Sequence, residues 1–217
     1  VYPGSRSGVP PVAQLPILEF PDPRLRTVAA PVDPVQLASA YGVFANGGYL
    51  VSPWLVQRIS DGRGSVLFES DRTATPAEDA RAIDARNAFV TDSMLREVTR
   101  TGTAASASQR LGRDDLAGKT GTTNDAVDGW FAGYATDVVS VAWMGYDAPK
   151  SLGGRELGST LALPIWIDSM RQALKGTVAS ERPVPDNVVL VDGRWNFSEF
   201  ESDAGVKTLG LNEPADE

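Results

Sequence analysis

The residues best suited to chemistry lie in one short stretch, Lys119-Thr120-Gly121-Thr122. Lys119 carries a cation, the two threonines carry hydroxyls, and the glycine between them leaves room for another backbone to approach closely. An edge strand of this kind can hydrogen-bond an extended peptide as an added strand, while the cation and the hydroxyls hold the peptide's carboxylate. These residue types therefore indicate a site for a carboxylate-bearing peptide.

The element expected to carry these residues is a β-hairpin. Two short apolar and β-branched runs flank a turn-rich centre that contains Asn124 and Gly129, and this pattern predicts two strands joined by a longer loop. Because side chains alternate along a strand, Lys119 and Gly121 are expected on one face and the two threonines on the other. The alternative is an ordinary hairpin, whose threonines favour strand structure and whose lysine is solvated.

A longer match extends beyond these four residues. Lys-Thr-Gly is the third signature of the serine penicillin-recognising enzymes, beside Ser-x-x-Lys and Ser-x-Asn. Residues 118–125 and 128–134 resemble the transpeptidase domain of the bifunctional, class A penicillin-binding proteins. The resemblance includes residues 36–48 upstream and 162–166 downstream, and it covers roughly residues 34–174.

The resemblance implies an α+β fold, a partial form of the penicillin-binding and β-lactamase-like transpeptidase fold with helices flanking an antiparallel sheet. The whole domain would have about five strands, of which this chain supplies most, together with the C-terminal helix. Without the remaining helices, one sheet face is expected to lie uncovered, which predicts marginal stability or association. The expected division is a Pro-rich segment over residues 1–33, the C-terminal half of the transpeptidase domain over 34–176 and an acidic extension over 177–217.

The resemblance also implies the chemistry. In the family, the serine of Ser-x-x-Lys attacks the D-Ala-D-Ala bond of a peptidoglycan stem peptide, and β-lactams trap that serine. By the family's pattern, Lys119 supplies positive potential and the hydroxyls of Thr120 and Thr122 bind the substrate carboxylate. The backbone N–H of Thr122 forms half of an oxyanion hole. The catalytic residues implied are Lys119 and Thr122, and the substrate-binding residues implied are Lys119, Thr120, Gly121, Thr122, Thr123 and Asn124.

Local signals predict further elements around the hairpin. Asp33 and Pro34 suit the N-cap and first position of a helix, and the run Asn46-Gly47-Gly48 suits its end. Residues 101–103 resemble the Gly/Thr-rich loop near the substrate cleft of this family, although a helix C-cap followed by a small-residue linker over residues 101–106 explains them equally well. The other expected elements are a hairpin over 53–59 and 65–69, a loop over 70–82, a helix over 84–100, a strand over 138–146, a helix over 160–174 and a strand-like run over 187–191.

The serine that the family requires does not occur in these 217 residues: no serine has a lysine three positions later, and no Ser-x-Asn is present. Family order places both motifs before residue 34, where residues 17–32 instead resemble the N-terminus of bacterial peptide deformylases. Deformylase activity needs His and Cys metal ligands, and the chain has neither residue type, so that activity does not carry over. The segment is interpreted as a foreign fusion or a chance match.

The resemblance therefore implies part of a D,D-transpeptidase for cell-wall cross-linking, inactive without the missing N-terminal half of its domain. Its expected ligands are peptidoglycan stem peptides and β-lactams, and its expected location is the periplasmic face of the cytoplasmic membrane. The alternative is a non-catalytic remnant or chimeric module, with at most weak binding of carboxylate peptides or β-lactams.

Composition limits the other classes of function. A net charge of −8 argues against nucleic acid as a partner, because phosphate binding needs clustered lysine and arginine. No apolar run reaches the ~20 residues that span a bilayer, and residues 1–7 do not have the pattern of a signal peptide. The lack of cysteine and histidine excludes disulfides, a cysteine nucleophile, a Ser-His-Asp triad and His-based metal sites, and no cofactor is expected.

Overall fold

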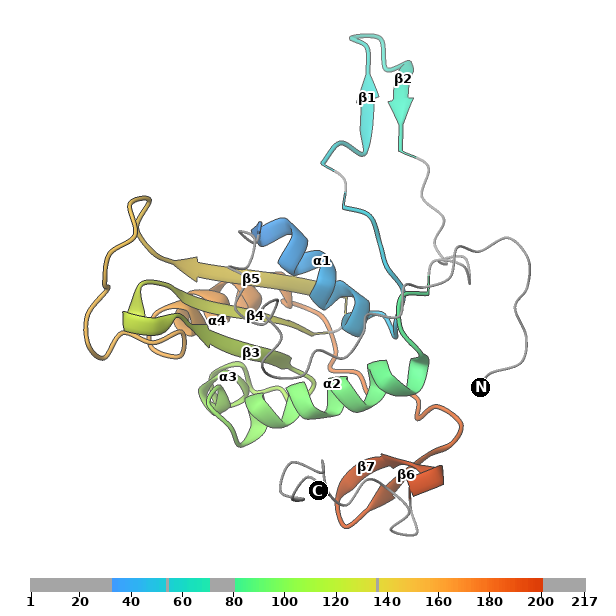
Figure 1. The fold of residues 1–217 in the computed structure, drawn as a ribbon. Helices are drawn as coiled ribbons and strands as arrows, with labels where there is room; N and C mark the ends of the chain where they lie inside the picture. The colour runs from blue at the N-terminus through green and yellow to red at the C-terminus, as the bar shows by residue number, and fades with distance from the viewer. Residues whose placement is uncertain (1–32, 54, 71–80, 136, 201–217) are drawn as a thin grey trace, which may run out of the picture.

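The computed structural model describes residues 33–53, 55–70, 81–135 and 137–200. A three-stranded antiparallel sheet in the order β3-β4-β5 lies at the centre of this part of the chain, with helices packed around it (Figure 1). The strands of this sheet are β3 (Ala117–Thr122), β4 (Gly129–Ala135) and β5 (Val138–Met144). The helices are α1 (Pro34–Ala45), α2 (Ala85–Arg100), α3 (Ala105–Leu111) and α4 (Ala162–Ala173). Separate hairpins are formed by β1 (Arg58–Ser60) with β2 (Val66–Glu69) and by β6 (Val188–Val191) with β7 (Arg194–Phe197), and the 3₁₀ turns are η3 (Asn124–Ala126) and η4 (Ser198–Phe200).

Helices α1 and α2 begin where the sequence predicts, because each has an aspartate at its N-cap. Asp33 accepts a hydrogen bond from the N–H of Val35 at 2.6 Å, and Gln36 completes a capping box by accepting from the N–H of Asp33 at 3.4 Å. Asp84 accepts from the N–H of Arg86 at 2.9 Å. These bonds satisfy N–H groups that the first turn of a helix leaves without partners.

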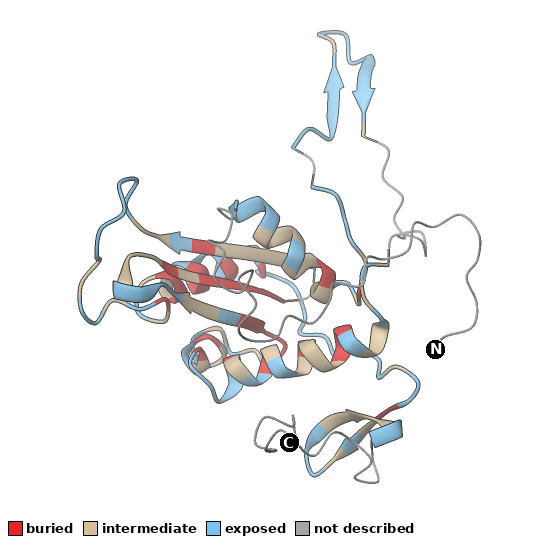
Figure 2. Cartoon of the chain, viewed as in Figure 1, coloured by how far each residue is buried: buried red, intermediate tan, exposed pale blue. Residues whose placement is uncertain are grey.

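One face of the sheet packs against α4 to form the core. Phe131 of β4 contacts Trp166 of α4 with ring centroids 4.8 Å apart, and both side chains are fully buried. The indole N–H of Trp166 donates to the backbone oxygen of Ser140 in β5 at 3.0 Å, so the buried polar group also has a partner. Buried residues are concentrated along β4 and α4 (Figure 2).

The short helix α3 includes residues 105 and 106, so the small-residue linker that the sequence offers as one interpretation of residues 101–106 is wrong for these two residues. It runs from Ala105 to Leu111, and its C-cap is Gly112, whose φ of 64° lies in the left-handed region that favours glycine. Ala104 and Ala107 are fully buried in the core beneath it. Packing therefore stabilises a helix whose own sequence has no stripe of large apolar residues.

The opposite face of the sheet is partly covered by α1, which contacts β4 and β5 (Figure 1). The expectation of a face without any cover is therefore wrong for the part that lies against α1. Elsewhere on this face Trp143 of β5 remains 41% exposed. The uncovered area is smaller than expected because α1 itself, predicted from the sequence, turns back onto the sheet.

The two hairpins differ in how they relate to the body of the protein. The β1–β2 hairpin, which the sequence predicts with longer strands, extends away from the body with all of its strand residues exposed (Figures 1 and 2). The β6–β7 hairpin packs against α2 through Phe89 and Trp195, whose ring centroids lie 5.1 Å apart. Strand β7 was not predicted, although Asp192 and Gly193 form its turn with φ of 49° and 76°, and such a pair is a hairpin signal.

The contact between β4 and α4 leads to a prediction about stability. We expect Trp166→Ala to lower the free energy of unfolding by about 3–5 kcal/mol, because it removes a fully buried aromatic ring and leaves a cavity. Ile165→Ala is the matched control on the same helix, since Ile165 is 43% exposed, and we expect a change within about 0.5 kcal/mol. Urea unfolding of the three proteins measures both values. Equal losses for the two variants would contradict this account of the core.

Candidate functional site

The strand β3 lies at the edge of the central sheet. Among the described residues its only neighbour in the sheet is β4, with Lys119 opposite Ala132 and Thr120 opposite Phe131. Side chains directly opposite each other share a face of the sheet. Lys119 therefore lies on the face with Ala132, away from the core, and Thr120 lies on the face with Phe131, as the predicted alternation of side chains requires. The Lys119 side chain is exposed. The strand thus presents a cation at an open edge.

Three polar side-chain groups converge at the middle of β3. The ammonium of Lys119 donates to the backbone oxygen of Thr120 at 2.9 Å and lies 3.3 Å from the Thr120 hydroxyl. The hydroxyl of Thr103 lies at the same distance, 3.3 Å, from the Thr120 hydroxyl. Thr103 belongs to the loop between α2 and α3, where Thr101 serves as the C-cap of α2. The helix C-cap that the sequence offers for these residues is thus present at Thr101, while a place near the substrate cleft stays a prediction. The sequence alone does not pair Thr103 with Thr120.

The Thr122 hydroxyl is oriented from a distant part of the chain. The backbone N–H of Gly158 donates to Thr122 Oγ1 at 3.0 Å. A side chain at position 158 would clash with the backbone oxygens of Gly121 and Trp130, so glycine is needed for this close approach. Because the N–H occupies a lone pair of the hydroxyl oxygen, the hydroxyl proton of Thr122 remains available to donate to a ligand.

Thr123 and Asn124, the last two residues of the predicted binding wall, belong to the turn beyond the strand. Thr123 Oγ1 accepts from the N–H of Asp128 at 2.8 Å, and the Thr123 N–H donates to the backbone oxygen of Asp128 at 3.2 Å. Asn124 starts the turn η3, which continues through Asp125 with a φ of 60°. The structure therefore places these two residues in a different setting from the convergent group of Lys119, Thr120 and Thr103.

A hollow of about 410 Å³ lies beside Lys119, between the sheet and α1. Its lining residues are Leu37 and Tyr41 of α1, Lys119, Thr120 and Gly121 of β3, and Trp130 and Ala132 of β4. Burial raises the pKa of the Tyr41 phenol, so this wall stays uncharged even where an ordinary tyrosine begins to ionise. The hollow is thus mainly apolar with a cation at its rim, a combination suited to a molecule that has both an anionic group and an apolar part.

Comparison with known proteins identifies the family. The family model described as "Penicillin binding protein transpeptidase domain" matches residues 29–165, more than half of the chain. The chain belongs to this family. Penicillin-binding protein 1A of Neisseria lactamica is 44% identical over 166 residues, which are 76% of this chain and 21% of that protein. Penicillin-binding protein 1A of Pseudomonas aeruginosa is 39% identical over 205 residues, covering 74% of this chain and 25% of that protein.

Solved structures agree with this assignment. The crystal structure of penicillin-binding protein 1A from Haemophilus influenzae matches with a TM-score of 0.67 and 29% identity, covering 73% of this chain and 28% of that one. The penicillin-binding protein PonA1 from Mycobacterium tuberculosis matches with a TM-score of 0.58 and 29% identity, covering 69% of this chain and 40% of that one. The predicted resemblance to class A penicillin-binding proteins and the predicted α+β fold class are confirmed. The chain spans about a fifth to a quarter of the length of the curated relatives above.

Several sequence predictions lie outside what the structure describes. The deformylase-like residues 17–32 and most of the predicted loop over 70–82 fall outside the described residues. In the described part of the chain, no group of three or more His, Cys, Asp or Glu side chains is arranged to hold a metal. None of the helices in that part is both long and apolar enough to cross a membrane.

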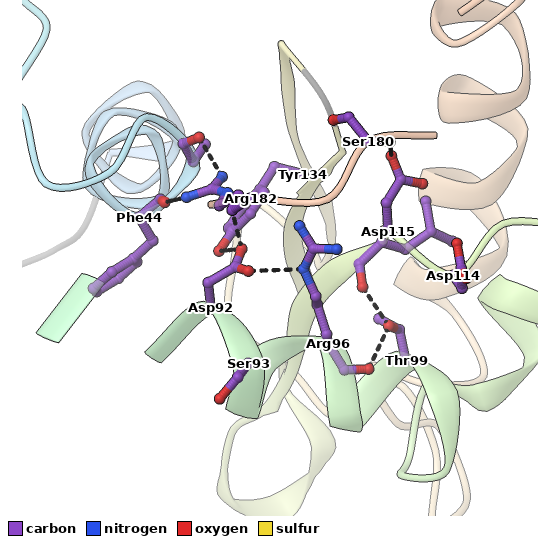
Figure 3. A network of polar contacts seen from close by, with 12 residues as sticks. Phe44, Asp92, Ser93, Arg96, Thr99, Asp114, Asp115, Tyr134, Ser180 and Arg182 are labelled. Carbon is purple, nitrogen blue, oxygen red and sulfur yellow. Dashed lines mark hydrogen bonds and ion pairs between the residues drawn. The ribbon is translucent and has the colours of Figure 1, made fainter. Parts of the chain in front are cut away.

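A buried polar network of this transpeptidase domain is centred on Asp92 (Figure 3). The phenol of Tyr134 on β4 donates to Asp92 of α2 at 2.9 Å, and Arg96 donates to the same carboxylate at 2.7 Å. The guanidinium of Arg182 lies 3.5 Å from it. Burial, with the adjacent negative charge of Asp92 as the second cause, raises the pKa of Tyr134 well above its ordinary value. The network thus ties α2, β4 and the segment after α4 together.

The contact at Gly158 predicts a penalty for adding a single methyl group. We expect Gly158→Ala to lower the free energy of unfolding by about 1–3 kcal/mol, because the added Cβ clashes with backbone oxygens of β3 and β4 and forces the backbone to shift. Gly154→Ala is the matched control in the same loop, since a Cβ there meets nothing within 4 Å. Thermal unfolding measures stability, and the NMR shifts of the Thr122 side chain, whose hydroxyl oxygen accepts from the Gly158 N–H, report the lost hydrogen bond. If the Thr122 side-chain shifts were unmoved in Gly158→Ala, the orienting role of Gly158 would be wrong.

The raised pKa of Tyr134 predicts a pH dependence of stability. The folded state holds the Tyr134 proton more tightly than the unfolded state, whose pKa is near the ordinary value of 10.0. The contribution is therefore fully present below pH 10.0 and is lost as the pH rises above that value. We expect the stability difference between the wild type and Tyr134→Phe to shrink above this pH, as measured by urea unfolding at several pH values. A constant difference would contradict the assignment, since all other titrating groups are shared.

Proposed function

We propose that the chain is the C-terminal half of a serine D,D-transpeptidase domain that cross-links peptidoglycan stem peptides. On this proposal its parent works at the periplasmic face of the cytoplasmic membrane, where the stem peptides are exposed. The observation that carries the proposal is the convergence of the Lys119 ammonium with the hydroxyls of Thr120 and Thr103 at an open strand edge. Membership of the transpeptidase family supports it.

In the proposed complex, the stem peptide lies along β3 as an added strand. Its terminal carboxylate accepts hydrogen bonds from the hydroxyls of Thr120 and Thr122 and lies in the positive potential of Lys119. Gly121 adds no side chain to the wall, so the peptide backbone can approach closely. The exposed position of Thr122 and the proton left free by the Gly158 contact suit this role.

The proposed reaction needs a serine from outside these residues. The serine hydroxyl attacks the carbonyl carbon of the D-Ala-D-Ala bond, and the backbone N–H of Thr122 donates one of the hydrogen bonds that stabilise the resulting oxyanion. The C–N bond then breaks, the terminal D-alanine leaves as an amine, and the acyl group is passed to the amine of a neighbouring stem peptide. The role of this chain is to bind and orient the donor.

A second candidate is a module that binds carboxylate peptides or β-lactams weakly and catalyses nothing. The observation that favours it is the absence of Ser-x-x-Lys and Ser-x-Asn from the 217 residues. The two candidates agree on the binding wall and differ on whether a separate segment completes it. On either one, the isolated chain has a carboxylate site and no nucleophile.

The isolated chain is expected to bind a substrate-like carboxylate without being acylated. Incubation with a fluorescent penicillin should give no covalent adduct by intact mass, while a full-length class A penicillin-binding protein labels in parallel. N-acetyl-D-alanyl-D-alanine should shift the backbone amides of residues 119–122 in NMR spectra. We expect Lys119→Ala to weaken that binding by about tenfold or more, because it removes a charged partner of the carboxylate.

Two controls make this experiment decisive. Lys150→Ala removes a lysine that lies over the ring of Tyr146 instead of in the site, and it should leave the affinity unchanged. The dipeptide amide lacks the carboxylate and should not bind. A stoichiometric penicillin adduct would show an activated serine outside the expected motif, and shifts confined to residues away from β3 would place the carboxylate site elsewhere.

A further inference from the structure

The segment that follows α4 returns across the domain to the end of α1. It lies beyond residue 165, where the match to the transpeptidase family ends. Arg182 in this segment extends into the network of Figure 3, between α1 and Tyr134. Its side chain is only 19% exposed. Arg182, which lies outside the range matched by the family model, is thus largely buried beside α1 and Tyr134, which lie inside that range.

The guanidinium of Arg182 contacts three elements at once. It donates to the backbone oxygens of Phe44 and Ala45, at the C-terminal end of α1. It lies 3.5 Å from the carboxylate of Asp92 in α2, and its central carbon lies 5.5 Å from the ring centroid of Tyr134 in β4. The planar fork of an arginine can make such contacts together, whereas a single ammonium cannot.

These contacts supply the basic group that the last turn of α1 lacks. The last turn of a helix leaves backbone oxygens without partners and carries partial negative charge, so a cation is stabilising there. Helix α1 has no basic residue in its own last turn. Arg182 supplies that cation from 137 positions further along the chain. Asp92 in turn makes burial of the guanidinium favourable, because a buried cation needs a partner of opposite charge.

We propose that Arg182 is a positioning residue and that residues 177–185 act as a strap, which holds α1 against the sheet face beside Lys119. Helix α1 contributes Leu37 and Tyr41 to the wall of the hollow. The ring of Tyr41 in turn contacts that of Phe44, at a centroid distance of 6.2 Å, next to the carbonyl groups that Arg182 binds. The part of this inference that concerns ligands rests on the proposed function, in which the hollow adjoins the binding wall.

Hydrogen exchange of the full chain tests the strap without any ligand. Arg182→Met keeps most of the aliphatic stem and removes the donors, while Asp92 retains Arg96 and Tyr134 as partners. We expect the amides of α1 to exchange about tenfold faster or more, since hydrogen bonds to charged groups contribute on that scale. The amides of α4 should be unchanged. Arg171→Met is the matched control, because Arg171 pairs with Asp168 on the surface of α4.

Other outcomes overturn the proposal. Equal acceleration in α1, α2 and α4 would make Arg182 a general stabiliser, and unchanged α1 exchange would show that the strap holds nothing.

Arg182→Lys retains the charge opposite Asp92 but not the fork, and should give intermediate α1 exchange even if Arg182→Met fails to fold. Weaker binding of N-acetyl-D-alanyl-D-alanine in Arg182→Met, with Arg171→Met unaffected, would link the strap to the site. If the wild type does not bind that dipeptide, the proposed function fails while the exchange result still decides the strap.

Discussion

The arrangement around the hollow depends on one buried charge, the carboxylate of Asp92, which is only 3% exposed. A carboxylate removed from water is strongly destabilising unless charged and hydrogen-bonding partners surround it. Its partners Arg96, Tyr134 and Arg182 come from α2, β4 and the segment after α4. Since the three can reach the carboxylate together only when these elements are correctly placed, the buried charge selects one arrangement among those that apolar packing alone would tolerate.

The central sheet uses one face and its β3 edge differently: the face packs the core, and the edge carries the residues of the proposed binding wall. One face carries Phe131 against Trp166 and provides the core. Close packing continues into β3, where a Cβ on Gly118 would meet the Phe131 ring and the backbone oxygen of Ala132. The next residue, Lys119, is exposed at the edge. An exposed lysine on an edge strand also discourages unwanted pairing with other chains. Lys119 can therefore protect the sheet edge as well as serve the proposed binding of a carboxylate.

Local sequence signals were enough to predict the elements that have local causes. Asp33 and Asp84 cap α1 and α2, and the run of small and β-branched residues around Lys119 predicted the central hairpin. Strand β7 is an exception, since its Asp192-Gly193 turn is a local signal that the predictions do not use. The other features that the sequence does not predict depend on contacts between distant residues. Helix α3 depends on the burial of Ala107, and the orientation of Thr122 depends on Gly158, 36 positions away. The contact of Arg182 with Ala45 spans 137 positions. No window of sequence contains both partners of such a pair, so periodicity and capping rules cannot reveal them.

Binding of a carboxylate and acyl transfer make different demands on the residues of this chain. Thr103 contacts Thr120 and Gly158 contacts Thr122, so both contacts to the proposed binding wall lie within this chain. On the proposed function, the hydrogen bonds to a carboxylate require positioned donors and a cation, which these residues supply. Acyl transfer makes a further demand, since it needs a nucleophile and a base within hydrogen-bonding reach of each other. Binding and reactivity can therefore reside on separate segments of such a domain, and an ordered binding wall is no indication that the reacting serine is at hand.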